Sequence, residues 1–183
     1  LAQLDPGAEI VVLEGMTVGE GSSGRNSGFA ASFDTKTGLS RAEAERAAAV
    51  NRFAAEGFAD LMAAMEQGGF TCDLEQTGRI VAAATAAGEI KAREQFEGAR
   101  AHGVEAEWLD REGLRAAIGS GYYRAGARTA EGYLLQPAAL VRGLADSLPA
   151  AVTLHENRPV LAIEGAGPRT VRTPQAQLDA DHG

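Results

Sequence analysis

The sequence is poor in cysteine, in aromatic side chains and in long apolar stretches. One cysteine among 183 residues, Cys72, cannot form an internal disulfide, which excludes a disulfide scaffold and fits a reducing cytoplasm. Aromatic residues make up 5% of the chain, so we expect no dense aromatic core. The sequence has no apolar run of the roughly 18 residues that a membrane span requires, and no visible signal peptide. We therefore predict a cytoplasmic protein without a membrane span.

Basic residues are also in short supply. The 17 Lys and Arg residues face 25 Asp and Glu residues, which gives a formal net charge of −8. An acidic surface repels phosphate backbones, so we expect no nucleic-acid partner and no anionic membrane surface as partner. A small anionic cofactor stays possible, because backbone N–H groups bind one locally.

Both ends of the chain have the pattern of internal positions. Leu1 to Leu4 is typical of a last helical turn, which Asp5-Pro6-Gly7 would stop. The apolar run E-I-V-V-L-E over residues 9–14 then predicts a buried parallel strand. Residues 178–183 carry no capping element. We interpret the chain as a fragment, and a small complete domain with frayed ends is the alternative.

The remaining pattern mixes helices and strands, which indicates an α/β or α+β fold. Ser40 and Glu43 have capping-box spacing at the start of a long helix expected to end near Gln67. Asp110 is expected to cap a short helix, and Pro137 to be a first helical residue. Further helices are expected over residues 85–101, 111–118 and 137–148. Strands are expected over residues 70–73, 78–84, 107–109, 121–127, 131–134, 152–156, 160–164 and 170–173.

A glycine-rich loop follows the first strand. Residues 19–24, G-E-G-S-S-G, match the dinucleotide fingerprint G-x-G-x-x-G. That fingerprint should follow a strand directly and open a helix, yet this strand ends at Glu14 and no helix is expected before Ser40. Glu14 can instead be the acidic residue that ends the second strand of a dinucleotide fold and binds a ribose. A flexible Gly/Ser linker is the third interpretation.

The loop has the residue types that bind a diphosphate. Gly21, Gly24 and Gly28 allow the backbone to approach a ligand closely and to adopt positive φ. Ser22, Ser23 and neighbouring N–H groups can donate to phosphate oxygens, and Arg25 can pair with phosphate.

The stretch V-V-L-E-G-M-T-V-G-E-G-S-S-G-R-N-S-G-F over residues 11–29 resembles a known family. It is similar to the second strand and following loop of FAD-dependent amine and amino-acid oxidoreductases, the superfamily of D-amino-acid oxidase, glycine oxidase and sarcosine oxidase. The S-G-R-N-S-G run is most similar to the gamma-glutamylputrescine oxidoreductase branch. Further resemblances follow in the family's order, at residues 72–81, 104–114, 132–144 and 156–164. In the third of these an Asp usually occupies the position of Gln136.

The resemblance implies an α/β fold: a partial Rossmann-like FAD-binding domain plus part of an α+β substrate domain. Residues 1–69 and 134–183 would form the FAD-binding domain, without its N-terminal fingerprint, and residues 70–133 would belong to the substrate domain. Glu14 would bind the adenosine ribose, the 22–24 segment would line the pyrophosphate, the 25–28 segment would run towards the isoalloxazine, and the main chain of Val160 would hold adenine. The implied cofactor-binding residues are Glu14, Gly15, Ser22, Ser23, Gly24, Arg25, Asn26, Ser27, Gly28 and Val160.

The reaction implied by the resemblance is oxidation of a C–N bond in a small amine or amino acid by hydride transfer to the flavin. The sequence assigns no catalytic residue and no metal ligand, and we expect this chain alone to be inactive. Two alternatives stay open: an NAD(P)-dependent dehydrogenase that uses Gly19–Gly24, and a non-enzymatic domain that binds a phosphate ligand. A helix starting at Gly24 would favour the dehydrogenase.

The other chemistry-bearing residues are assigned structural roles. His102, His155 and His182 lack metal-ligand spacing. Cys72 is expected to be a small core residue. We expect sheet packing for Trp108 and for the pair Tyr122-Tyr123, with a substrate pocket as the alternative.

Overall fold

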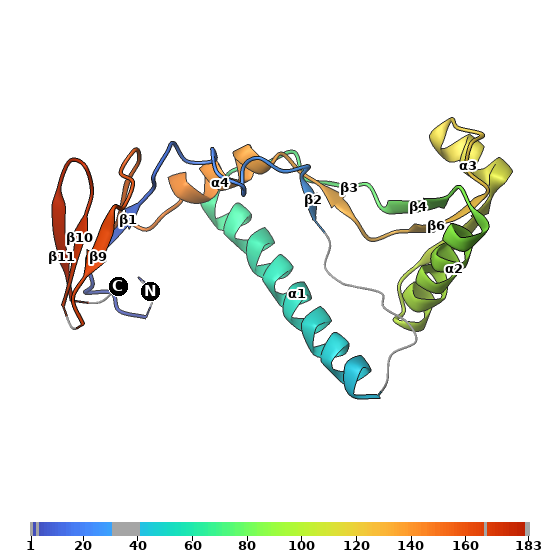
Figure 1. Cartoon of the computed structure of the whole chain (residues 1–183), viewed down its shortest axis with the longest axis horizontal. Coiled ribbons are helices and arrows are strands. Elements are labelled where there is room, and N and C mark those ends of the chain that lie inside the picture. Colours follow the sequence, from blue (N-terminus) through green and yellow to red (C-terminus); the bar gives the residue numbers. More distant parts are fainter. Residues whose placement is uncertain (1, 3, 31–40, 167, 182–183) are drawn as a thin grey trace. The chain divides into compact units, whose positions relative to one another are not determined.

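The computed structural model describes residues 2, 4–30, 41–166 and 168–181 (Figure 1). The chain forms two compact units, each built from segments distant in sequence. Unit 1 comprises Leu1–Ser27, Met65–Cys72 and Gln136–Gly183, and unit 2 comprises Gly28–Ala64 and Asp73–Leu135. The expected domain limits differ from this grouping mainly at residues 28–64, which lie with residues 73–135.

A parallel strand pair forms the centre of unit 1. Strand β1 (Ile10–Leu13) pairs with β8 (Val152–His155), although 142 positions separate Ile10 from its partner Val152. The prediction of a parallel strand in the E-I-V-V-L-E run is confirmed. The prediction that it is buried is wrong, because Val11 and Val12 are 40% and 39% exposed. Within the described residues β1 pairs with β8 on one edge and with no strand on the other. This two-stranded sheet covers little of the Val11 and Val12 side chains, which therefore stay exposed to solvent.

A three-stranded antiparallel meander follows β8 in the same unit. Strands β9 (Ala162–Glu164), β10 (Arg169–Arg172) and β11 (Gln177–Ala180) lie side by side, as Figure 1 shows. Arg172 pairs with Glu164 at 3.2 Å across the sheet. The sequence predicted the first two of these strands, but β11 was missed, since Q-L-D-A carries few apolar residues.

Helix α4 (Pro137–Asp146) completes unit 1. The side chain of Gln136 caps it by accepting hydrogen bonds from the main-chain N–H groups of Ala138 and Ala139, and Pro137 is the first helical residue as predicted. Gly143 is buried against the ring of Phe70. Absence of a side chain at this helix position therefore allows the segment after α1 to pack closely.

The main sheet of unit 2 has the order β4-β6-β5 and is antiparallel throughout. Its strands are β4 (Arg79–Ala83), β5 (Ala106–Asp110) and β6 (Ala125–Thr129). Helix α2 (Ala86–Ala101) packs on this sheet, and Leu114 of helix α3 (Arg111–Ile118) lies against Gly126. Small buried side chains such as Ala83, Ala125 and Ala127 make up most of its core.

Helix α1 (Arg41–Gly68) confirms the long predicted helix, whose capping residue Ser40 lies outside the described residues. Phe58 of α1 contacts Tyr133 with ring centroids 4.6 Å apart. Tyr133 belongs to a small sheet of order β2-β7-β3, made of β2 (Phe29–Ala30), β7 (Tyr133–Leu134) and β3 (Glu75–Gln76).

The strand prediction over residues 70–73 is wrong, and the prediction over residues 121–127 is wrong in its first four residues. Residues 70–73 form no strand, because α1 ends in a turn in which the Phe70 N–H donates to the carbonyl oxygen of Met65, 3.3 Å away. Residues 121–124 form a bent loop, and strand β6 begins at Ala125. Phe70 packs against Gly143 in a loop, and Tyr122 is 73% exposed, so neither segment has the packing of a sheet.

Candidate functional site

Glu14 lies at the carboxyl end of β1, where the parallel partner β8 also ends. Its Oε1 atom accepts a hydrogen bond of 2.9 Å from the main-chain N–H of Met16, which fixes the carboxylate over the start of the following loop. The second carboxylate oxygen makes no hydrogen bond within the described residues. Gly15 lies beside Pro159: a Cβ atom placed on Gly15 would be 3.7 Å from the Cα of Pro159. The site thus presents an open acceptor at a strand end.

The segments that follow β1 and β8 are joined by main-chain hydrogen bonds. The N–H of Glu14 donates to the carbonyl of His155 at 2.9 Å, and the N–H of Arg158 donates back to the carbonyl of Glu14 at 2.8 Å. Asn157 donates to the carbonyl of Met16 at 3.0 Å. The parallel pairing therefore continues beyond both strands and holds Glu14 in place.

The glycine-rich loop folds back on itself after Val18. Gly19 has φ +87°, a conformation that L side chains rarely adopt. Gly24 lies so close to the main chain of Gly19 that a Cβ at Gly24 would collide with the Gly19 carbonyl group. The N–H of Gly24 donates to Gly21 at 3.2 Å. The residues after Gly24 form bends and then β2, so the helix at Gly24 that a dehydrogenase fingerprint requires is not formed.

The side chain of Asn26 stabilises the fold of this loop. Its side-chain amide donates to the carbonyl oxygens of Ser22, at 3.2 Å, and Ser23, at 2.8 Å. The N–H groups and hydroxyls of both serines make no hydrogen bond within the described residues, and both serines are exposed. The loop therefore offers free donors to a ligand on Ser22 and Ser23, while the carbonyl oxygens of these two residues are occupied.

Two basic side chains lie in or beside the glycine-rich loop. Arg25 is exposed within the loop, and Arg142 of α4 reaches the loop from the side, 3.7 Å from the position of a Cβ at Gly19. Gly28 lies in unit 2, where it is buried with φ +74° and accepts a hydrogen bond of 2.9 Å from the N–H of Leu135. Ser27 is exposed at the end of unit 1.

Val160 follows the segment that contacts Glu14. It is 43% exposed, and its main-chain N–H and C=O make no hydrogen bond in the part of the chain that the structure describes. The predicted strand over 160–164 begins later, at Ala162, although the N–H of Leu161 donates to the carbonyl of Arg172 at 2.8 Å. A free main-chain donor and acceptor thus stand next to each other in unit 1.

These features fit the adenosine diphosphate half of a dinucleotide. A carboxylate suits ribose hydroxyls, free N–H groups and arginines suit a diphosphate, and an open main-chain donor and acceptor suit the edge of adenine. Gly24 packs directly on the main chain of Gly19, and this tight fold of the loop leaves no room for a side chain at Gly24. Sequence reasoning missed Glu156, Asn157 and Arg142, and the turn-forming string E-N-R-P after β8 was the available signal.

Of the other residues singled out by sequence, Cys72, His102 and Trp108 have structural surroundings, whereas Tyr122 is 73% exposed and lies in no strand. Cys72 is buried with its sulfur 3.8 Å from that of Met65, and His102 ends α2 with Nδ1 2.8 Å from the Gly98 carbonyl. Trp108 packs edge-on against Phe96 and carries the guanidinium of Arg93 3.6 Å above its ring. Among the described residues, His, Cys, Asp and Glu side chains form no group of three that could hold a metal ion. His182 lies outside the described residues.

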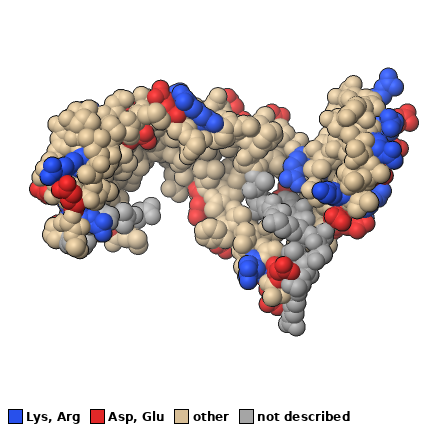
Figure 2. All heavy atoms as spheres, in the orientation of Figure 1, with Lys and Arg blue, Asp and Glu red and all other residues tan. Residues whose placement is uncertain are grey.

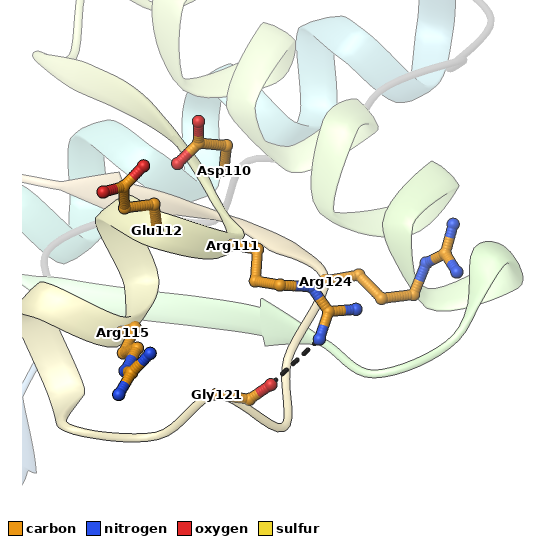
Figure 3. Close-up of a pocket in the computed structure, with 6 residues that line it drawn as sticks. All are labelled: Asp110, Arg111, Glu112, Arg115, Gly121 and Arg124. Carbon is orange, nitrogen blue, oxygen red and sulfur yellow. Dashed lines mark hydrogen bonds between the residues drawn. The ribbon is translucent and has the colours of Figure 1, made fainter.

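A wide groove of about 710 Å³ in unit 2 is lined by arginines and acids (Figure 3). Arg111 donates to the carbonyl of Gly121 at 3.0 Å, and Arg115 and Arg124 point to opposite sides. Arg124 pairs with Glu89 at 3.3 Å. The three carboxylates of Glu89, Asp110 and Glu112 balance the charge of the three arginines. Figure 2 shows acidic and basic side chains intermingled over α2 and α3. The groove is therefore a poor anion site.

No helix in the described part of the chain is both long and apolar enough to cross a membrane.

Comparison with known proteins places these features in a family. The profile of the DAO family, described as FAD dependent oxidoreductase, matches residues 1–182. No curated protein matches the sequence.

Several solved structures share the α/β fold. Glycine oxidase from Geobacillus kaustophilus superposes with a TM-score of 0.75 at 18% identity, over 93% of this chain and 46% of that one. L-amino acid deaminase from Proteus myxofaciens, in complex with anthranilate, gives 0.70 at 18% identity over 97% and 39%. Reduced L-α-glycerophosphate oxidase from Mycoplasma pneumoniae, with FAD bound, gives 0.63 at 14% identity over 91% and 43%. The chain thus spans less than half the length of each.

Proposed function

Because this chain belongs to the FAD-dependent oxidoreductase family, we propose that it binds the adenosine diphosphate half of FAD at the carboxyl end of β1. The observation that carries the proposal is that Glu14 and the loop that follows it both present polar groups without a partner among the described residues. Glu14 presents an open carboxylate oxygen, and the following loop presents unpaired N–H groups on Ser22 and Ser23. A carboxylate oxygen can accept from ribose hydroxyls, and free N–H groups can donate to a diphosphate. The two groups therefore suit two neighbouring parts of one dinucleotide.

Each residue then has a stated part in holding the cofactor. Glu14 accepts from the ribose hydroxyls, and Gly15 keeps that strand end free of a side chain. The main chain and hydroxyls of Ser22 and Ser23 donate to the diphosphate, and Gly24 allows the tight fold of the loop. Val160 meets adenine through its main chain. The remaining proposed contacts run towards the isoalloxazine, partly through the main chain: Arg25, Asn26, Ser27 and Gly28.

We propose further that the gene product carrying this chain oxidises the C–N bond of a small amine or amino acid. When bound, FAD supplies the acceptor for the hydride from the amine-bearing carbon, and water hydrolyses the resulting imine. This chain binds and orients the cofactor. Residues 1–69 and 134–183 form the FAD-binding part in this proposal, and residues 70–133 belong to the substrate-binding part. Glycine oxidase and L-amino acid deaminase among the similar structures support this substrate class.

The test uses the purified gene product that carries this chain. Its visible spectrum is recorded with FAD, before and after anaerobic addition of single amines, amino acids and glycerol 3-phosphate. We expect oxidised flavin bands that bleach with an amine or amino acid. Bleaching by glycerol 3-phosphate alone would overturn the amine assignment, and a colourless protein that FAD does not reconstitute would overturn the flavin site. The 183-residue chain with added FAD serves as the control, and we expect it not to turn over substrate.

A further inference from the structure

One side chain joins the two segments that meet at the end of β1 and β8. The carboxylate Oε1 of Glu156 accepts a hydrogen bond of 2.6 Å from the main-chain N–H of Val18, across 138 positions of sequence. This is the shortest of the bonds given above between these segments.

The backbone around Glu156 is shaped for this contact. Asn157 adopts φ 55°, a conformation that asparagine tolerates better than most residues, and so directs its own N–H to Met16. Glu156 is exposed and makes no other hydrogen bond within the described residues. Because Glu156 is exposed and makes this single hydrogen bond, it contributes little to the stability of the core. Its main effect is to restrain the segment that contains Val18.

That segment is the entry to the glycine-rich loop. Val18 directly precedes Gly19, where the chain reverses with positive φ and against which Gly24 packs. A displacement of Val18 therefore moves the fold of the whole loop, including the free N–H groups of Ser22 and Ser23. The three main-chain bonds fix residues up to Met16, and Glu156 extends this restraint to Val18.

We propose that Glu156 is a positioning residue for FAD, which fixes the glycine-rich loop in its diphosphate-binding form through the N–H of Val18. The inference rests on the proposed FAD site. It requires the oxygen acceptor of Glu156 and not its charge, since a negative charge near a diphosphate opposes binding. The role is thus distinct from that of Glu14, which contacts the cofactor.

Three variants of the gene product separate acceptor from charge. Glu156→Ala removes both, and Glu156→Gln keeps an Oε1 acceptor without the charge. Glu9→Ala is the matched control, because Glu9 is an exposed glutamate of the same unit without a hydrogen bond in the described residues. Circular dichroism checks that each variant is folded.

Two readouts are taken from each variant: amide hydrogen exchange at Val18 in the cofactor-free protein, and the FAD dissociation constant from flavin fluorescence. We expect Glu156→Ala to lose Val18 protection and to weaken FAD binding about tenfold, as loss of one hydrogen bond between an N–H group and an oxygen acceptor does. Glu156→Gln should retain protection and bind FAD at least as tightly as the unsubstituted protein. Glu9→Ala should change neither readout.

The outcomes separate this inference from the proposed function. FAD binding that is equal in Glu156→Ala and the unsubstituted protein overturns the role of Glu156 and leaves the FAD site standing. Weakened binding in Glu156→Gln as severe as in Glu156→Ala also overturns it, because the charge would then be the active feature. Failure of the unsubstituted protein to bind FAD overturns the proposed function itself. If Glu156→Ala does not fold, Glu156→Gln and Val18 exchange decide the matter.

Discussion

At the scale of single residues, Gly24 and Gly21 lie three positions apart in one loop with different surroundings. A Cβ at Gly24 collides with the main chain of Gly19, whereas a Cβ at Gly21 has no heavy atom within 4 Å among the described residues. We expect Gly24→Ala to distort the loop at an overpacking cost of about 1–3 kcal/mol, and Gly21→Ala to be nearly neutral. FAD titration of both variants checks this. Equal affinities would show that the turn at Gly24 plays no part in binding.

Glu14 allows a second prediction at the residue scale. Glu14→Gln keeps an oxygen acceptor for the N–H of Met16 and removes the negative charge that a ribose hydroxyl would bond. Bonds to charged acceptors exceed neutral ones by about 1 kcal/mol, so we expect roughly a fivefold loss of FAD affinity. Calorimetric titration measures it, with Glu9→Gln as the control. An equal loss of FAD affinity in Glu9→Gln would contradict the prediction, because the change in net charge alone would then explain the effect.

At the scale of secondary-structure elements, two glycine-to-alanine substitutions test the contact between α4 and the segment that follows α1. Gly143 of α4 is buried against Phe70, and an alanine there would overlap the ring. We expect Gly143→Ala to lower the free energy of unfolding by about 1–3 kcal/mol. Gly57 lies in α1, exposed and with no atom near the position of its Cβ. Gly57→Ala should instead raise stability by roughly 0.5–1 kcal/mol, because alanine favours helix.

Urea unfolding of both glycine variants measures these changes. Opposite signs are the expected result. A neutral effect of Gly143→Ala would mean that Phe70 moves aside without loss, and that α4 is not held by this contact.

Elements with strong local signals were predictable from the sequence. The long helix α1, the capping of α3 by Asp110 and the start of α4 at Pro137 all follow from periodicity and caps, which act within a few residues. Weakly apolar strands such as β11 were not predictable, since neighbours in space stabilise them. The loss of a strand at residues 70–73 has the same origin, because Phe70 packs on α4 instead of pairing.

The site was predictable to a smaller degree. The residue types of the loop and the place of Glu14 at a strand end could be inferred from the chain, because both depend on adjacent positions. The bond from Val18 to Glu156 spans 138 positions, and the approach of Arg142 to Gly19 likewise depends on tertiary packing. Contacts of this kind need the fold, which no local pattern supplies.

At the scale of the whole molecule, family membership and site geometry lead to the same cofactor. The family is FAD dependent, and we propose that the described residues bind the ribose, the diphosphate and the adenine of that cofactor. All of these belong to the adenosine diphosphate half of FAD, which FMN and riboflavin lack. The central claim therefore predicts which part of the cofactor this chain recognises.

Competition binding tests that claim most directly. Bound FAD in the gene product that carries this chain is titrated with ADP and, separately, with FMN. We predict that ADP displaces FAD, that FMN displaces it far less, and that Gly24→Ala weakens ADP binding while Gly21→Ala does not. Displacement by FMN with no effect of ADP would contradict the account, because the cofactor would then be held by its flavin end and not by the loop behind Glu14.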